Sequence, residues 1–185
     1  MKRNCLHLNS ESGPMKKLLS LVLFLTAATG FGQEGYPVPP DNPLRLFYIQ
    51  HANNHNTFVY DANFRGKAIK DDEPIKVYRI NYKKGGIEEE LTSMQRKMAY
   101  GVEVLKTAIN TFEFTLAAYP AKKLILKVNN ANDPYVTVYI NGRHIILRRM
   151  FLFCNKLGTG VSSINFYGKD AATHKDVIEK LVLNQ

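Results

Sequence analysis

The sequence predicts a mainly β protein, an antiparallel barrel-like or sandwich domain of about nine or ten strands with one short helix. From residue 44 onward, short segments rich in Val, Ile, Phe and Tyr alternate with clusters of Asn, Gly, Asp and Pro. Helical periodicity is mostly confined to residues 88–101. Asn141-Gly142, between two apolar segments, is a strong hairpin signal, because both residues tolerate the positive φ of a type I′ turn.

The first half of the domain contains three predicted strands. Residues 44–50 (LRLFYIQ) and 57–64 (TFVYDANF) flank the polar sequence HANNHN, which predicts a hairpin. Residues 75–82 (IKVYRINY) follow an acidic, proline-containing loop and predict the third strand.

The helix is expected over residues 93–100. Thr92 and Gln95 have the spacing of a capping box, and Gly101 suits a left-handed stop. Met94 and Met98 recur at helical intervals, so we expect them to fill the core between the helix and the sheet.

The second half of the domain has five further segments with the composition of strands: 111–119, 124–128, 135–140, 144–154 and 161–167. We expect a turn at Pro120 and Ala121 between the first two. Residues 173–183 fit either an amphipathic helix or a turn followed by a final strand.

The segment before residue 44 is expected to direct the protein out of the cytoplasm. Residues 15–32 combine a basic start, an apolar run and small residues before Gln33, which predicts a signal peptide and a periplasmic or secreted location. The apolar run is too short to span a bilayer, and no later segment suffices. We therefore expect a mature protein that does not span a membrane. Residues 1–14 are interpreted as an upstream extension, 33–43 as a proline-rich tether, and 44–185 as one domain.

The charge and the cysteines of the mature chain each exclude one feature, a nucleic-acid partner and an internal disulfide. Removing residues 1–32 takes away four basic residues and one acidic residue, which lowers the formal net charge from +9 to +6. The remaining basic residues are scattered, so we expect no nucleic-acid partner. Cys5 leaves with the same segment, so Cys154 cannot form an internal disulfide and is expected to be a small buried apolar residue.

Three blocks resemble one family: LFYIQHANNHNTFVYDANF at 46–64, LTSMQRKMAYG at 91–101 and INFYGKDAATHKDVIEKL at 164–181. They are similar to the secreted bacterial family named domain of unknown function 4833, over nearly all of 44–183. The resemblance implies no assigned activity and no catalytic residues.

Two positions depart from the family pattern, which has Arg where this chain has His51 and Gly where it has His174. The first departure removes a basic group that could contact an anion. The glycine implies a turn with positive φ, which His also adopts more often than most residues. The resemblance therefore favours a terminal hairpin over a helix at 173–183.

Arg149 is the first candidate for a binding residue. Strand alternation places it on the face of four apolar residues: Ile145, Leu147, Phe151 and Phe153. A guanidinium in such surroundings needs a carboxylate or an anionic ligand, because an unpaired buried charge is costly. Three carboxylates are candidate partners in a structural role: Glu103, Glu113 and Asp61.

Three more residues complete the candidate ligand-binding set. Arg79 interrupts a predicted apolar strand as Arg149 does, and the neighbouring Tyr78 is one of several strand tyrosines that could line a cavity. His51 lies in the polar hairpin turn, four residues before His55, but no Glu stands in the position that a zinc-binding helix motif requires. No metal site is predicted.

These patterns predict a non-enzymatic module that binds a small anionic or amphipathic ligand or an envelope protein. The sequence has no nucleophile elbow, P-loop or dinucleotide-binding motif, so we predict no catalytic residue and no cofactor. Two alternatives stay open: an envelope hydrolase with a site around His51 and His55, and a structural partner of another envelope protein.

Overall fold

The computed structural model describes residues 36–155 and 160–183. The chain divides into two units, Met1–Pro37 and Val38–Gln185, and all the described helices and strands lie in the second. The predicted upstream extension at 1–14 and signal peptide at 15–32 lie outside the described residues. No helix in the described part of the chain is long and apolar enough to cross a membrane.

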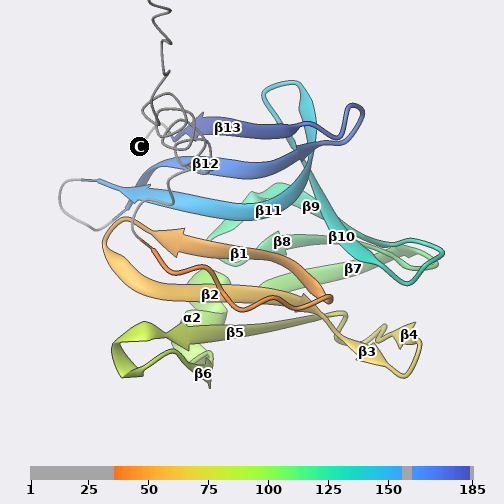
Figure 1. Cartoon of the computed structure of the whole chain (residues 1–185), viewed down its shortest axis with the longest axis horizontal. Helices are drawn as coiled ribbons and strands as arrows, with labels where there is room; N and C mark the ends of the chain where they lie inside the picture. Colours follow the sequence, from red (N-terminus) through yellow and green to blue (C-terminus); the bar gives the residue numbers. More distant parts are fainter. Residues whose placement is uncertain (1–35, 156–159, 184–185) are drawn as a thin grey trace, which may run out of the picture. The chain divides into compact units, whose positions relative to one another are not determined.

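Eleven strands of the second unit form one curled sheet with two branches (Figure 1). The β1 branch consists of β1 (Arg45–His51), β2 (Asn54–Ala62), β5 (Ile75–Asn81) and β6 (Ile87–Glu90). The β10 branch consists of β7 (Val102–Ala108), β8 (Thr111–Leu116), β9 (Tyr119–Val128) and β10 (Pro134–Ile140). Both branches join one edge of β11 (Arg143–Cys154), and its other edge pairs with β12 (Val161–Asp170). The last strand, β13 (Asp176–Val182), pairs with the far edge of β12.

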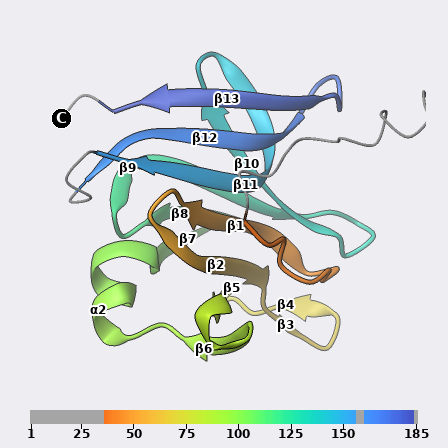
Figure 2. The ribbon, with the colours of Figure 1, turned by 60° about the vertical axis from the view of Figure 1, so that its left-hand side comes forward.

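The short elements complete the fold. A separate hairpin contains β3 (Phe64–Arg65) and β4 (Ala68–Ile69), and a 3-10 turn, η1 (Tyr82–Lys84), follows β5. The helix begins as α2 (Ser93–Gln95) and continues as a π-helical turn, η2 (Arg96–Tyr100). Figure 2 shows the helix where the chain passes from β6 to β7.

The two branches enclose the main hydrophobic core. Phe47 of β1 stacks on Tyr60 of β2, with ring centroids 4.3 Å apart, and faces Phe114 of β8 at 6.3 Å. We call the sheet face toward this core the inner face and the opposite one the outer face. A smaller cluster of Val59, Tyr78 and Ile80 lies on the outer face of the β1 branch.

The mainly β prediction is confirmed, with thirteen strands in the described part of the chain against an expected nine or ten. The Asn-Gly hairpin is confirmed, since Asn141 and Gly142 have φ of 49° and 82°. Residues 176–182 form a strand that pairs with β12, so the terminal hairpin is confirmed over the helix.

The helix is confirmed over 93–100, together with its capping box. Thr92 Oγ1 accepts from the amide of Gln95 at 3.2 Å, and Gln95 Oε1 accepts from the amide of Thr92 at 3.0 Å. Gly101, however, is extended rather than left-handed. A side chain at this position would collide with the carbonyl of Arg96, which the wide π turn brings close. A glycine is therefore required for steric reasons.

The methionines of the helix do not fill the core, so that prediction is wrong. Met94 and Met98 are 75% and 72% exposed, whereas Leu91, which precedes the helix, and Tyr100 at its end pack into the core.

Two further local predictions differ from the structure. The turn between β8 and β9 falls at residues 117–118, and Pro120 lies within β9. Cys154 is a free cysteine at the end of β11, but it is half-buried rather than buried.

Candidate anion-binding site

Arg148 lies at the point where the sheet branches. Along one edge of β11, pairing with β10 ends at Leu147 and parallel pairing with β1 begins at Arg149. Along the other edge, the register with β12 shifts between the same two residues. Arg148 therefore has no register partner in any of the three described neighbouring strands, which makes it the bulged residue of β11. Bulges re-aim side chains, and the Arg148 side chain is exposed.

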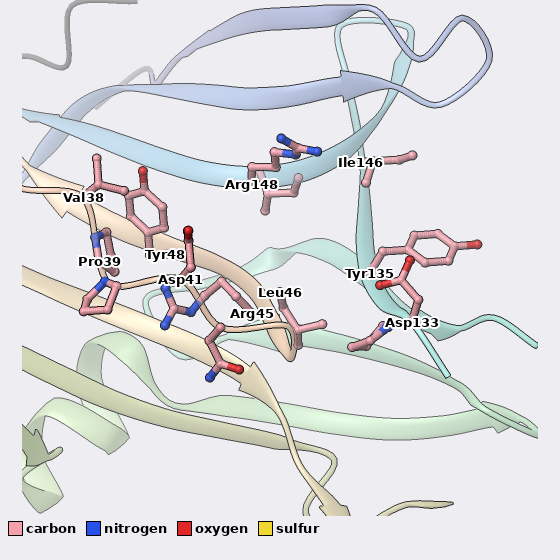
Figure 3. Close-up of a pocket in the computed structure, with 14 residues that line it drawn as sticks. Val38, Pro39, Asp41, Arg45, Leu46, Tyr48, Asp133, Tyr135, Ile146 and Arg148 are labelled. Carbon is pink, nitrogen blue, oxygen red and sulfur yellow. The ribbon is translucent and has the colours of Figure 1, made fainter. Parts of the chain in front are cut away.

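Two adjoining cavities share the Arg148 side chain. Cavity 1, of about 440 Å³, lies in the fork between β1 and β10, and cavity 2, of about 800 Å³, lies over β9 to β12. Four residues line both: Asp133, Tyr135, Ile146 and Arg148. Figure 3 shows cavity 1 with Arg148 on β11 above it.

Cavity 2 gathers positive charge from three strands. Among the described residues that line it, the cations are Lys127 of β9, Arg148 of β11 and Lys169 of β12, and the one carboxylate is that of Asp133. The register pairs Lys127 with Tyr135 and Lys169 with Ile146, which places both lysines on the same outer face. The strand pairing therefore brings these three cations together from distant parts of the sequence.

Two imidazoles, of His144 and His174, also line cavity 2. His174 has φ of 55°, so the turn takes the left-handed conformation that the family's glycine implies. Asp170 Oδ1 holds this turn by accepting from the amides of Ala172 at 3.0 Å and Thr173 at 2.8 Å. These hydrogen bonds lower the pKa of Asp170, and the bond from the Thr173 amide has the largest effect. The carbonyl of His144 accepts from the amide of residue 171 at 2.9 Å, which ties β11 to the turn.

Cavity 1 is less basic than cavity 2. Prolines and the side chains of Leu46 and Tyr48 contribute much of its lining. Its carboxylates are those of Asp41 and Asp133, on opposite sides of the cavity (Figure 3). The cations among its described lining residues are Arg45 and Arg148, and Arg45 binds the buried carboxylate of Asp61 behind the lining.

That buried carboxylate, Asp61, fixes the wall of cavity 1. Asp61 accepts hydrogen bonds from Arg45 Nε at 2.5 Å, Asn42 Nδ2 at 2.7 Å and the Tyr78 hydroxyl at 2.9 Å. Asn42 Oδ1 in turn accepts from the amide of Leu44 at 2.9 Å. The segment that precedes β1 is therefore tied to β2 and β5, and the charge of Arg45 is balanced by Asp61.

Arg149 lies beside the two cavities, on the outer face. Its guanidinium lies 4.7 Å from the ring centroid of Tyr167 and 5.0 Å from that of Phe151. The predicted face is wrong in part, because the bulge at Arg148 places Ile145 and Leu147 in the inner core and leaves Arg149 on the other face. Two of the candidate carboxylates bind other cations: Asp61 binds Arg45 and Glu113 binds Lys123.

The other candidate residues are held by protein partners. Tyr78 donates to Asp61, and burial, together with that carboxylate, raises the pKa of Tyr78 to about 12. Arg79 binds Glu89, whose pKa is lowered to about 2 by hydrogen bonds from Lys84, Arg79 and Asn81. Their roles in ligand binding stay predictions.

His51 faces the inner side of the sheet, away from both cavities. Its Nε2 lies 3.0 Å from the Tyr100 hydroxyl, and burial lowers its pKa to about 4. His55 is exposed. Within residues 36–155 and 160–183, no group of three His, Cys, Asp or Glu side chains could hold a metal ion.

The structure therefore does not bring the four predicted residues together. Arg149 and Tyr78 lie on the outer face, whereas His51 and Arg79 lie at inner-face positions, opposite Leu152 and Phe58. The residues that sequence reasoning missed are Arg148, Lys127 and Lys169. Their outward positions follow from strand alternation, but their convergence depends on the order of strands and on the bulge.

A family model described as a domain of unknown function (DUF4833) matches residues 47–180. The chain belongs to this family. No curated protein and no solved structure matches it. The match to DUF4833 covers the branch point, the lining residues of cavity 2 and half of those of cavity 1.

Proposed function

We propose that this DUF4833 domain is a non-enzymatic module that binds an anionic group in cavity 2. The observation that carries the proposal is the meeting of Lys127, Arg148 and Lys169 on one face, with Asp133 as the carboxylate among the described lining residues. Lysine and arginine donate charge-assisted hydrogen bonds to phosphate and carboxylate, and arginine does so in a planar fork.

The size of cavity 2 supports a small-molecule ligand or a short segment of an envelope component. Its volume of about 800 Å³ falls in the range of ligand pockets. The half-buried Tyr135 and Ile146 supply apolar surface beside the cations, which suits an amphipathic ligand.

We also propose that the domain works in the periplasm or outside the cell. The support is the signal-peptide pattern at residues 15–32. Sequencing the N-terminus of the protein exported by its own host tests this proposal. A mature chain that begins at Gln33 supports it, and retention of residues 1–32 contradicts it.

Phosphate titration tests the anion site. We expect Arg148→Gln to weaken phosphate binding by about tenfold, because one charge-assisted hydrogen-bonding group is lost. Arg65→Gln is the matched control, since Arg65 is exposed on β3 and lines neither cavity. Equal binding by the two variants, or no phosphate binding by the unmodified chain, contradicts the proposal.

A further inference from the structure

Charge is separated along the two cavities. The cations Lys127 and Lys169 line cavity 2 alone, whereas Asp41 lines cavity 1 alone. Asp133 and Arg148 stand where the cavities meet. A ligand that fills both cavities therefore meets Lys127 and Lys169 at one end and Asp41 at the other.

Resting on the proposed function, we infer that the ligand is a zwitterion with a phosphate or carboxylate at one end and a primary amine at the other. The anionic end occupies cavity 2, and the ammonium lies in cavity 1 between Asp41 and Asp133, which stand on opposite sides of that cavity. An ammonium donates three hydrogen bonds and carries the charge that these two carboxylates complement.

The partners of Arg45 strengthen this assignment. Arg45 is the cation nearest to Asp41 along the chain, but its Nε binds Asp61, which also accepts from Asn42 and Tyr78. Asp61 thus balances Arg45, so in cavity 1 the two carboxylates of Asp41 and Asp133 outnumber the remaining cation, Arg148.

The lining between the two ends includes apolar side chains. Tyr135 and Ile146 line both cavities, and Leu46, Tyr48 and the prolines at 39 and 40 add apolar surface within cavity 1. An aliphatic linker or a short peptide backbone between the two charged ends fits this lining. An isolated inorganic anion would leave most of both cavities filled by water.

Matched ligands test the inference on the full chain. Aminohexyl phosphate and aminohexanoate carry an amine, and their N-acetylated forms lack its charge. We expect each amine to bind about fivefold more tightly than its acetylated form, as two exposed ion pairs allow. Comparing the phosphate with the carboxylate shows which anionic end is preferred.

The variants separate the two ends. Asp41→Asn and Asp133→Asn should abolish the advantage of the amine, whereas Arg148→Gln should weaken all four ligands alike. Asp72→Asn is the control, because Asp72 is exposed and lines neither cavity.

The outcomes distinguish the inference from the proposed function. If phosphate binds but amine and acetylated ligands bind equally, the zwitterion is wrong and the anion site stands. If Asp133→Asn tightens all four ligands equally, Asp133 merely neutralises Arg148, which also overturns the inference. If no ligand and no phosphate binds, both proposals fall.

Discussion

The hydroxyl of Tyr100 lies 3.0 Å from Nε2 of His51, which joins the end of the helix to the end of β1. The Tyr100 ring stacks on Phe58 with centroids 3.4 Å apart, and its carbonyl accepts from the Tyr60 hydroxyl at 2.8 Å. Through these contacts, one residue of the helix holds two strands of the β1 branch. His51 is buried among them, so its protonation must be coupled to folding.

Stability should fall as the pH is lowered from about 6.5 to about 4. The pKa of His51 is lowered to about 4 in the folded protein, from 6.5 in the unfolded chain. Between these values the unfolded chain binds the proton and the folded one does not, so acidification favours unfolding, by up to about 3 kcal/mol. Urea denaturation across this range measures the loss.

Carboxylates also titrate as the pH falls, and the variant His51→Gln separates the contribution of His51 to the free energy of unfolding from theirs. The amide keeps a hydrogen-bonding group near Tyr100 but does not titrate. The difference in unfolding free energy between the two proteins should therefore change between pH 6.5 and 4. A constant difference would show that His51 titrates normally.

Removing the Asp61 carboxylate should destabilise the domain strongly. Asp61→Ala leaves Arg45, Asn42 and Tyr78 without their shared acceptor, and Asp61 itself is 6% exposed. Breaking such a buried pair costs about 3 kcal/mol. Tyr78→Phe removes one of the three bonds and should cost about 1 kcal/mol. Equal losses in the two variants, measured by urea denaturation, would contradict this ranking.

Local signals in the sequence predict the elements that local chemistry determines. The capping box at Thr92 and the Asn141-Gly142 turn each depend on neighbouring residues, and both are present as expected. The bulge at Arg148 depends instead on three strands that meet β11, so period-two alternation assigns the wrong neighbours to Arg149.

The candidate site is harder to predict for the same reason. Lys127, Arg148 and Lys169 come from three strands, and their meeting follows from a strand order that no local pattern encodes. The exposed Met94 and Met98 show a related limit. Helical spacing predicts that two residues share a face of the helix, but it does not predict whether that face packs against the sheet.

Asn141 should protect the edge of β13. Its Nδ2 donates to the carbonyl of Lys180 at 3.1 Å and to Glu179 Oε2 at 3.2 Å. Asn141→Gly keeps a residue that tolerates the left-handed turn but removes both bonds, so we expect a loss of about 1 kcal/mol and faster amide exchange in β13. Asn110→Gly is the control, because Asn110 has φ of 54° in another hairpin. Equal exchange in both variants would contradict this role.

Gly168 should be required for the bulge that presents Arg148. It pairs with Leu147, and a Cβ at position 168 would collide with the carbonyl oxygen of Ile146 and lie 2.8 Å from Ile145 Cγ2. Gly168→Ala should therefore cost about 3 kcal/mol and displace β11 at the branch point.

The variant Gly66→Ala is the control for Gly168→Ala, because it introduces backbone strain without a steric collision. Gly66 has φ of 64° with nothing within 4 Å of its Cβ position, so the substitution should cost only about 1 kcal/mol. Because the displaced β11 carries Arg148, Gly168→Ala should also weaken phosphate binding, whereas Gly66→Ala should not. Unchanged phosphate binding in a destabilised but folded Gly168→Ala protein would show that the bulge does not depend on the glycine.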